Sequence, residues 1–309
     1  MDDRQSHDAD HDVVIVGGGP AGCSAGVFTA RYGLDTVVFD RGNAALPRCA
    51  YLENYLGFPA GVDVDAFQEL MHAHVEEVGS TVVPELVESV ERADGDARFT
   101  VETDEGRRVV ADYVVAAAWY DGSYLRALDE PTMFEQQEHH GEVEERFDPD
   151  YPDADGRTPV AGLYVASPAG QRSAQAVVAA GNGGHVARCL IEDRRRERGF
   201  PEGVAPHYDW LRPETEFSGE WDDRDRWREW FENEVGDDHD LDDDRFIELR
   251  EAYIDRAFGT RRSESEIEAR SDRGVRKLVE VLGTERVLDA VDDEALRNYV
   301  AETDADAQS

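Results

Sequence analysis

The chain has 309 residues and a formal charge of −38, from 70 acidic and 32 basic side chains. This charge argues against binding to the phosphate backbone of nucleic acids, which requires clustered Lys and Arg, and against anionic membrane surfaces. The length suggests one large domain with a smaller one, or two domains.

The acidic residues are spread through every segment, and Lys277 is the single lysine. Wide acidic cover with Arg in place of Lys is typical of a protein from a high-salt cytoplasm, where salt screens the self-repulsion of the surface. An ordinary acidic protein is the alternative. Residues 1–12 do not resemble a signal peptide, and no apolar run approaches the roughly 20 residues of a membrane span. We therefore expect a cytoplasmic protein.

The start of the chain has a β-α-β pattern. Val13 to Val16 is an apolar strand that leads into a glycine-rich turn, and the helix after it ends at Tyr32, before Gly33. A second apolar strand, Thr36 to Phe39, ends at Asp40. Two short apolar strands joined by a helix predict a buried parallel pair.

Further elements follow as far as Ala118. A loop punctuated by Gly and Pro, residues 41–60, precedes a helix at 64–78 that Gly79 ends. A strand at 81–83 leads to a β-meander over 86–115, with strands at 86–90, 98–102, 108–110 and 113–118.

The rest of the chain is less regular. Residues 119–161 are polar, acidic and punctuated by proline, whereas a strand is expected at 163–166 and a helix at 174–190. Glycines inside that helix are costly, and they are explained if the helix packs tightly or kinks there. From His207 the periodicity is helical, with a capping-box pattern at Ser263 and Glu266 and a loose tail over the last eight residues. One apolar face of this region comprises Phe246, Ile247, Leu249, Tyr253, Ile254 and Phe258.

Gly17, Gly19 and Gly22 form a G-x-G-x-x-G pattern between the first strand and its helix. The first glycine allows the tight turn, the second lets a pyrophosphate approach the backbone, and the third lets helix and strand pack closely. Asp40, at the end of the next strand, is placed to accept hydrogen bonds from the ribose hydroxyls of adenosine. The pattern predicts a dinucleotide site and does not separate FAD from NAD; a glycine-rich turn that binds nothing is the alternative.

The segment ENYLGFPAG, residues 53–61, resembles the E-N-[YF]-P-G-F-P-x-G segment of the thioredoxin reductase family of flavoproteins. The resemblance runs from about Val13 to Ala118 and resumes from Gly162 to about Leu190, where the family's G-x-[FY]-A-A-G-D and R-Q-x-x-x-A-A-G-D-G-x-x-A appear as GLYVASP and AQAVVAAGNGGHVA. We therefore expect an α/β protein: a Rossmann-like FAD-binding domain, with a parallel sheet and β-meander, plus a helical C-terminal region. The expected FAD-binding domain spans 12–118 and 162–200, a short insert at 119–161 stands in place of an NADPH domain, and the helical region spans 207–303.

The resemblance also implies site residues. Asn54 and Gln175 are placed near the flavin, and Ala176 begins the helix that faces its carbonyl end. Ser167-Pro168 stands where the family has a Gly-Asp whose carboxylate binds the ribitol chain; this change costs on the order of 1.5–3 kcal/mol of binding, and Ser167 or nearby main chain is expected to substitute. The expected cofactor-binding residues are Gly17, Gly19, Pro20, Ala21, Gly22, Asp40, Arg41, Asn54, Ser167, Gln175 and Ala176.

The chain departs from the family in its redox machinery. The insert is shorter than the roughly 100 residues of an independent nucleotide domain and has no second glycine pattern, and Cys23, Cys49 and Cys189 form no CxxC. Reduction of thioredoxin disulfides by NADPH is therefore not expected. The family's G-G-Q segment appears as ALPRCAYLEN, which places Cys49 beside Arg48 and near the flavin ring. Cys49 is the candidate catalytic residue, because a cation favours the thiolate; an inert buried residue is the alternative, and the other two cysteines are expected in the core.

The remaining candidate site residues are interpreted as structural or surface residues. No spacing typical of a metal site is present, and His139 and His140 are assigned to a solvated loop. His72 and His74 are expected at the surface and partly in the core of their helix. Four tryptophans are expected to form the core of the helical region, with an active-site cover or a dimer seam as the alternative: Trp210, Trp221, Trp227 and Trp230.

Together these features predict a FAD-binding oxidoreductase that resembles thioredoxin reductase, lacks its own NADPH site, and takes electrons from an unknown donor or a small-molecule substrate. One alternative is a non-catalytic module that binds FAD or another adenine nucleotide for structure or sensing. The other is a protein-interaction scaffold in which the helical region does the work. We expect no nucleic-acid or membrane partner, and the sequence leaves room for a homodimer.

Overall fold

The computed structural model describes residues 9–42, 45–94, 98–118, 122–128, 130–139, 142–167, 175–236 and 239–306. The chain forms two compact units, residues 1–261 and residues 262–309. No helix in the described ranges is long and apolar enough to cross a lipid bilayer.

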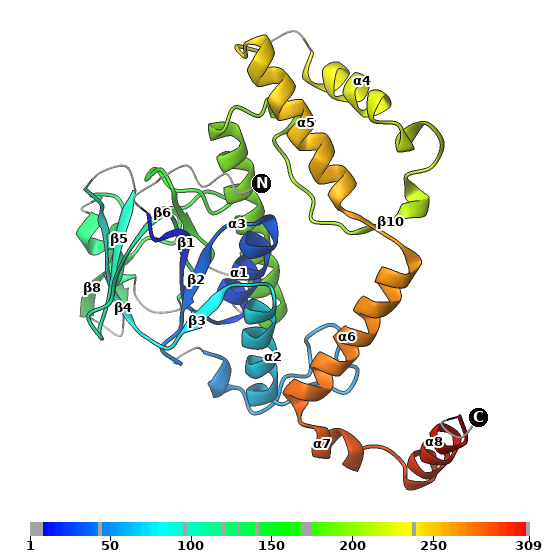
Figure 1. Cartoon of the computed structure of the whole chain (residues 1–309). Helices are drawn as coiled ribbons and strands as arrows, with labels where there is room; N and C mark the ends of the chain where they lie inside the picture. Colours follow the sequence, from blue (N-terminus) through cyan, green and yellow to red (C-terminus); the bar gives the residue numbers. More distant parts are fainter. Residues whose placement is uncertain are drawn as a thin grey trace. The chain divides into compact units, whose positions relative to one another are not determined.

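A seven-stranded sheet forms the centre of the first unit (Figure 1). Its order is β3-β2-β1-β6-β5-β4, and β9 also pairs with β6. The pairs among β3, β2, β1, β6 and β9 are parallel, and those of the β4-β5-β6 meander are antiparallel. The predicted α/β fold with a parallel sheet and a meander is therefore confirmed. The strands are β1 (His11–Val16), β2 (Thr36–Phe39), β3 (Thr81–Val83), β4 (Val87–Arg92), β5 (Phe99–Thr103), β6 (Arg108–Ala116) and β9 (Leu163–Val165).

Strand β6 belongs to both parts of the sheet. Its first half pairs with β5, and its last three residues pair with β9. Strand β1 runs along both halves, from the pair of His11 with Ala111 to the pair of Val16 with Ala116. The prediction of two separate strands at 108–110 and 113–118 is wrong, because this shared partner carries the strand through the polar residue Asp112.

Alternate residues of β1 enter different hydrophobic cores, as the two-residue period of a strand requires. Val13 and Ile15 pack with residues of α1 (Pro20–Tyr32), α2 (Val64–Glu77) and α3 (Ala176–Glu197) on one face of the sheet. Val14 and Val16 belong to the core on the other face, with residues of the meander. The sheet is therefore buried on both sides, which explains why its parallel strands read as continuous apolar runs.

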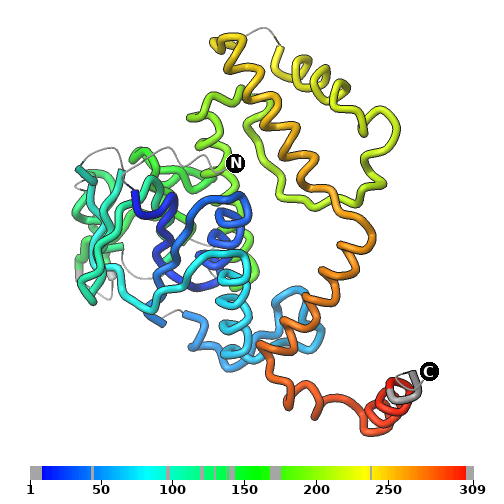
Figure 2. Tube along the Cα trace, in the orientation of Figure 1, coloured from blue at the N-terminus to red at the C-terminus, as the bar shows by residue number. Residues whose placement is uncertain are grey.

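Helices α3 and α1 pack side by side, as Figure 2 shows for the green and blue segments, and glycines of α3 lie at their contact. A Cβ atom on Gly183 would lie 1.9 Å from the carbonyl oxygen of Ala21, and one on Gly184 would lie 3.1 Å from the side chain of Phe28. A Cβ on Gly181 would meet nothing within 4 Å. Tight packing, the first of the two explanations for these glycines, is therefore confirmed at positions 183 and 184.

Helix α3 also continues beyond its predicted end at residue 190, as far as Glu197. Its last turns carry arginines that hold it to β1 and to the segment that follows the helix. Arg194 pairs with Asp12 at 2.9 Å, and Arg195, only 3% exposed, donates to the carbonyl oxygens of Val204 and Ala205. A polar sequence continues the helix here because its cations have fixed partners.

The segment between β6 and β9 contains a hairpin that the sequence does not indicate. After a 3-10 helix (Ser123–Leu128), β7 (Phe134–His139) pairs antiparallel with β8 (Glu142–Phe147). Most residues of both strands are polar or charged, so no alternating apolar pattern marks them. The hairpin is anchored through Met133 and Phe147 in the core. The side chain of His139 and the whole of His140 lie outside the described residues, so their assignment to a solvated loop stays a prediction.

Helices α4 (Arg224–Val235) and α5 (Asp243–Gly259) follow, as the helical periodicity predicts. They enclose an aromatic cluster built on Phe217, Trp227 and Ile254, with Trp221 and Trp230 packed against it. This confirms a core role for three of the four tryptophans, whereas Trp210 is 64% exposed. On the predicted apolar face of α5, Leu249 and Ile254 are buried and Ile247 is exposed. The short strands near these helices are β10 (Arg212–Pro213) and β11 (Arg261–Arg262).

The second unit consists of α6 (Glu264–Leu282), α7 (Thr284–Asp289) and α8 (Asp293–Asp306). The predicted capping box is confirmed: Ser263 Oγ accepts from the N–H of Glu266 at 3.3 Å, and Glu266 Oε2 accepts from the N–H of Ser263 at 2.9 Å. The expected loose tail is helical as far as Asp306, and the last three residues lie outside the described ranges. No residue described between 263 and 303 is buried.

We predict opposite effects for alanine at two glycines of α3. Gly183→Ala places a Cβ against the backbone of α1 and should destabilise the protein by about 1–3 kcal/mol or more. Gly181→Ala should stabilise it by about 0.5–1 kcal/mol, because alanine is the better helix former and the site has room. The free energy of unfolding, measured with denaturant at one salt concentration, checks both. Similar values for the two variants would contradict the close approach of α3 to α1.

Candidate functional site

A cavity of about 470 Å³ lies at the carboxyl ends of four parallel strands. Gly17, Asp40, Ala117 and Ser167 come directly or almost directly after β1, β2, β6 and β9, and all four line it. Ligands of open α/β sheets bind at this edge, where the strand ends and helix starts converge. Cavity walls also come from the segments at 45–54 and 85–87 and from the starts of α1 and α3.

The structure brings most of the predicted site residues to this cavity. Its lining includes Gly17, Gly19, Pro20, Ala21, Asp40, Arg41, Cys49, Asn54, Ser167, Gln175 and Ala176. The glycine turn and the turn after β9 are far apart in the sequence and border the same space. Gly22 does not line it, and Pro168 lies outside the described residues.

The turn after β1 has no room for side chains. Gly17 has a φ of +113°, and a Cβ there would lie 2.7 Å from the backbone nitrogen of Ala118. A Cβ on Gly22 would lie 1.7 Å from the carbonyl oxygen of Gly17. Gly18, which the motif leaves unspecified, is equally enclosed, because its Cβ would lie 2.4 Å from that of Asp40. The backbone of the turn therefore forms the cavity wall itself.

The positive ends of two helices face the cavity without a counter-charge from their own first turns. The N-cap residues are Gly19 for α1 and Gln175 for α3. Gly19 has no side chain, and the side chain of Gln175 makes no capping hydrogen bond. Neither first turn contains an acidic residue. The unpaired N–H groups at such helix starts carry a partial positive charge that suits a phosphate or another anion.

Asp40 is held at the cavity by groups that the sequence does not connect with it. Its Oδ1 accepts from the N–H of Gly42 at 3.0 Å. Its Oδ2 lies 3.2 Å from Nε2 of His72, which also donates to the carbonyl oxygen of Gly18 at 3.1 Å. This oxygen has the ion pair but no well-directed hydrogen bond within the described part of the chain. His72, expected at the helix surface or partly in the core, is thus a partner of the predicted ribose-binding carboxylate.

The pKa values of this pair follow from its burial and its contacts. Burial by itself would raise the pKa of the Asp40 carboxyl, but His72 and the N–H groups of Gly42 and Gly18 outweigh burial and leave the pKa lowered. The Asp40 carboxylate, with a further contribution from Cys23, raises the pKa of His72 to about 10. The histidine is therefore a cation near neutral pH and forms a charged pair with Asp40.

The loop at 52–62 presents Asn54 through a fixed backbone shape. Leu52 and Val62 exchange two backbone hydrogen bonds, of 3.1 and 2.9 Å, which close the loop. At Gly61, φ is +82° and a Cβ would lie 2.8 Å from the carbonyl oxygen of Leu52. Asn54 Nδ2 then donates to Gln175 Oε1 at 2.8 Å. The contact joins this loop to the start of α3, so the two residues that the resemblance assigns to the flavin hold each other.

The three cysteines have different environments. Cys49 is exposed and lines the cavity, so the burial that the alternative assumes is wrong, and the reactivity of Cys49 stays a prediction. Its neighbour Arg48 is not part of the lining. Cys23 and Cys189 are buried, as predicted. Cys23 does more than fill space, because its Sγ donates to the carbonyl oxygen of Gly18 at 3.1 Å.

Asn182 is a supporting residue that sequence reasoning missed. Its side chain is 8% exposed, and Nδ2 donates to the carbonyl oxygen of Ala166 at 2.7 Å. The bond ties α3 to the end of β9, just before Ser167. A buried amide requires a partner, so an asparagine among the small residues of this helix was the signal available in the sequence.

Comparison with known proteins finds similarity in the first part of the chain. Residues 11–118 match the family model described as pyridine nucleotide-disulphide oxidoreductase. NADPH-dependent thioredoxin reductase 3 of Arabidopsis thaliana is 35% identical over 120 residues, which cover 37% of this chain and 22% of that protein. Thioredoxin reductase of Pneumocystis jirovecii is 32% identical over 126 residues, 38% of each chain. The match thus spans well under half the length of these relatives.

Among solved structures, a thioredoxin reductase from Gloeobacter violaceus aligns with a TM-score of 0.49 and 20% sequence identity. The alignment covers 66% of this chain and 100% of that one. The family match at 11–118 includes the glycine turn, Asp40 and the Asn54 loop, and it ends before Ser167 and α3.

We predict that His72→Gln lowers the free energy of unfolding by about 1–3 kcal/mol near neutral pH, because it leaves the Asp40 carboxylate without its charged partner. The pKa of His72 is raised in the folded protein from its ordinary 6.5 to about 10. Its stabilising contribution is therefore complete below about pH 6.5 and is lost as the pH rises through about 10. Denaturation of both proteins at several pH values should show the difference shrinking over this window.

The matched control is His74→Gln, two residues further along α2. Burial lowers the pKa of His74, so this histidine is neutral in the folded and the unfolded chain above about pH 7, and the variant should differ from wild type by a constant amount there. A pH-independent difference for His72→Gln would contradict the ion pair.

Proposed function

We propose that this chain binds FAD in the cavity and acts as a flavin-dependent oxidoreductase related to the thioredoxin reductases. The observation that carries the proposal is the convergence of the glycine turn, Asp40 and the Asn54–Gln175 pair on one space. The similarity of residues 11–118 to thioredoxin reductases supports it.

The chemistry of the cavity fits a dinucleotide. The side-chain-free turn at Gly17 and Gly18 leaves backbone against the cavity, where a pyrophosphate needs a close approach. The uncapped start of α1 supplies N–H groups for its charge. Asp40 is an acceptor for ribose hydroxyls at the end of β2, the position that this chemistry requires.

The remaining walls suit the flavin end. Asn54 and Gln175 offer amide donors and acceptors, and the start of α3 offers N–H groups to a carbonyl-rich ring. When bound, the flavin supplies a carrier for hydride and electron transfer. In this proposal Ser167 takes the place of a ribitol-binding carboxylate, and Cys49 is the thiol placed to react beside the ring.

We propose further that the electrons come from a donor outside the chain. The segment from 119 to 161 is shorter than the roughly 100 residues of an independent nucleotide domain, and the three cysteines form no CxxC. A partner or small molecule that reaches the cavity is then the source or the acceptor of electrons.

The second candidate is a non-catalytic module that binds FAD or another adenine nucleotide for structure or sensing. The serine at position 167 favours it, because the buried side chain there carries no charge for the ribitol chain. Anaerobic spectra separate the two functions. A bound flavin that NADPH or another donor reduces and an acceptor reoxidises supports the oxidoreductase, and one that no donor reduces supports the module.

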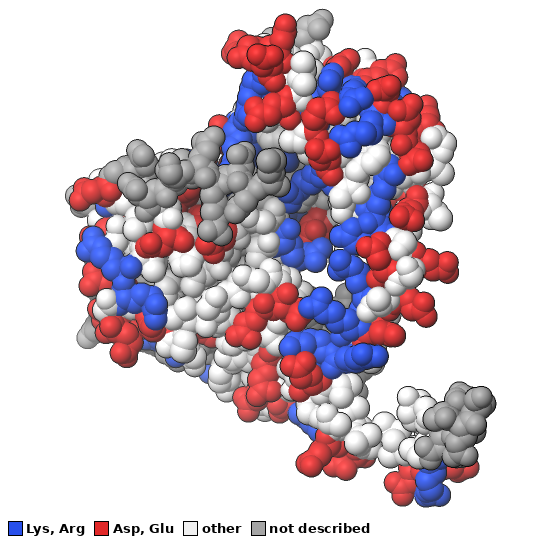
Figure 3. Space-filling model, in the orientation of Figure 1, with Lys and Arg blue, Asp and Glu red and all other residues white. Residues whose placement is uncertain are grey.

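We also propose that the protein works in a salt-rich cytoplasm. Figure 3 shows acidic and basic side chains interleaved over parts of the visible surface, around a broad area that carries neither, and acid is in large excess over the whole chain. Salt screens the repulsion among these charges. Binding experiments therefore belong in concentrated salt.

Arg41 gives the test of FAD binding. It is the one Lys or Arg among the described residues that line the cavity. We predict that Arg41→Gln weakens FAD binding about tenfold, because it removes a positive charge facing an anionic ligand. Quenching of flavin fluorescence measures the affinity. Arg48→Gln, a matched variant just outside the lining, should bind as wild type does, and wild-type protein that takes up no FAD in high salt would contradict the proposal.

Cys49 gives a test of where the flavin lies. We predict that an alkylating reagent modifies Cys49 in the folded protein, whereas the buried Cys23 and Cys189 stay unmodified. Bound FAD should slow this reaction several-fold, because Cys49 lines the cavity. Peptide mass spectrometry follows the modification, and Cys49→Ser is the control that should lose it. Equal rates with and without FAD would place the flavin away from Cys49.

A further inference from the structure

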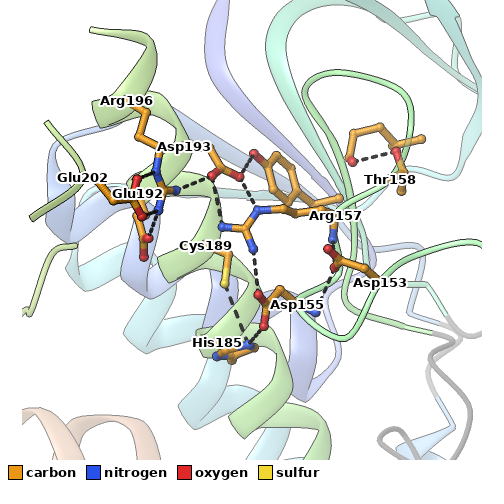
Figure 4. Close-up of polar contacts among 12 residues, drawn as sticks. Asp153, Asp155, Arg157, Thr158, His185, Cys189, Glu192, Asp193, Arg196 and Glu202 are labelled. Carbon is orange, nitrogen blue, oxygen red and sulfur yellow. Dashed lines mark hydrogen bonds and ion pairs between the residues drawn. The ribbon is translucent and has the colours of Figure 1, made fainter. Parts of the chain in front are cut away.

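Three potential metal ligands meet where α3 lies against the loop before β9 (Figure 4). His185 Nε2 lies 2.8 Å from Asp155 Oδ1 and 3.8 Å from Cys189 Sγ. The three donor atoms all lie within 4.8 Å of one another. They line a second cavity, of about 350 Å³, that shares no lining residue with the first.

The backbone holds these donors in place. His185 and Cys189 are four residues apart on α3, so their side chains share one face of the helix. Asp155 comes from the loop before β9, and the next residue, Gly156, fixes that loop against the helix. A Cβ on Gly156 would lie 2.6 Å from both the carbonyl oxygen of Val165 and the side chain of Val186. The carbonyl oxygen of Gly156 accepts a hydrogen bond from the N–H of Val165 at 2.8 Å.

The carboxylate of Asp155 is oriented by a second layer of charged groups. Its Oδ2 accepts from Arg157 at 2.8 Å, which leaves Oδ1 turned toward His185. Arg157 is itself held by a two-pronged contact with Asp193, at 2.7 and 3.0 Å, and Tyr164 donates to the same carboxylate at 2.9 Å. Such supporting contacts are what orients ligating carboxylates in metal sites.

A Cys-His-Asp catalytic triad would use the same residue types in another geometry. In a triad the two nitrogens of the imidazole face the nucleophile and the acid separately. Here one nitrogen, Nε2, faces both Asp155 and Cys189. Donors that converge on one point suit a cation placed between them.

We propose that Asp155, His185 and Cys189 bind a Zn²⁺ ion, with a fourth position open to water or another small ligand. Thiolate, imidazole and carboxylate are the ligands that Zn²⁺ prefers, at about 2.0–2.3 Å, which sets tetrahedral ligand atoms roughly 3.3–3.8 Å apart. The present spacing reaches this range by small rotations of Asp155 and His185, whose side chains are 45% and 43% exposed. The mixed sulfur and nitrogen set disfavours Mg²⁺ and Ca²⁺, which take oxygen ligands.

Such an ion would join the segment before β9 to helix α3. Asp155 and His185 are separated by 30 residues, so no local spacing in the sequence marks the site. The ion would stabilise the elements that also hold the FAD cavity, since Ser167 follows the end of β9, Gln175 is the N-cap of α3, and both line that cavity. This role is separate from the proposed redox function.

Cobalt provides a spectroscopic test, because Co²⁺ takes Zn²⁺ sites and a thiolate ligand gives it an intense charge-transfer band. The full-length protein without an affinity tag is kept reduced with a phosphine, and Co²⁺ is added in a large excess of Mg²⁺, which occupies the acidic surface. We expect one equivalent of Co²⁺ to give the thiolate band and Zn²⁺ to displace it. Wild-type protein without the band would overturn the proposal.

Variants assign the band to these residues. Cys189→Ser should abolish it, whereas Cys49→Ser, the exposed cysteine of the other cavity, should keep it. His185→Gln changes a half-exposed side chain without disturbing the core, and it should weaken Co²⁺ binding at least about tenfold. Zn²⁺ should raise the thermal unfolding midpoint of wild type and not that of Cys189→Ser. A band that survives Cys189→Ser, or an affinity unchanged by His185→Gln, would overturn the assignment.

Discussion

The contact of α3 with α1 at Gly183 is the constraint on which the candidate site depends. A helix from the second part of the sheet domain crosses a helix from the first with backbone against backbone, because no Cβ stands between Gly183 and the carbonyl of Ala21. Ala21 lies in the first turn of α1, next to the glycine turn, so the contact brings the two helix starts to one cavity. Asn182 and the Asn54–Gln175 bond complete the junction. A larger residue at position 183 would therefore act on the cavity as well as on stability.

The cavity presents positive and negative groups side by side. Two helix starts turn partial positive charge toward it, and its lining holds Arg41 together with the carboxylates of Asp40, Glu53 and Glu85. The buried carboxylate of Asp40 is compensated by His72. The arrangement separates an acceptor for hydroxyl groups from donors for anionic groups, which is the pattern that a dinucleotide requires.

Sequence reasoning succeeded where a short pattern has one structural cause. The glycine motif predicted the turn because each glycine position answers a local steric need, and the ENYLGFPAG segment predicted a loop that reaches the same cavity. It failed where the cause lies in another element. Gly18 has no room for a side chain because Asp40 lies against it, and His72 forms an ion pair with the same carboxylate. The polar hairpin β7–β8 is held by core residues at its ends. The residues near these positions in the sequence do not indicate which residues they contact.

The sequence by itself determined the elements that local physics controls: the apolar strands, the helix ends at glycine, the capping box of Ser263 and the order of the α/β domain. These depend on backbone conformation and on periodicity within a few residues. Only the tertiary structure decided which side chains meet across long separations, such as Asp40 with His72, Asn54 with Gln175, and Asp155 with His185 and Cys189. These contacts depend on how the strands pair and how closely the helices cross. A close crossing requires small side chains on both helices, and those helices are far apart in the chain.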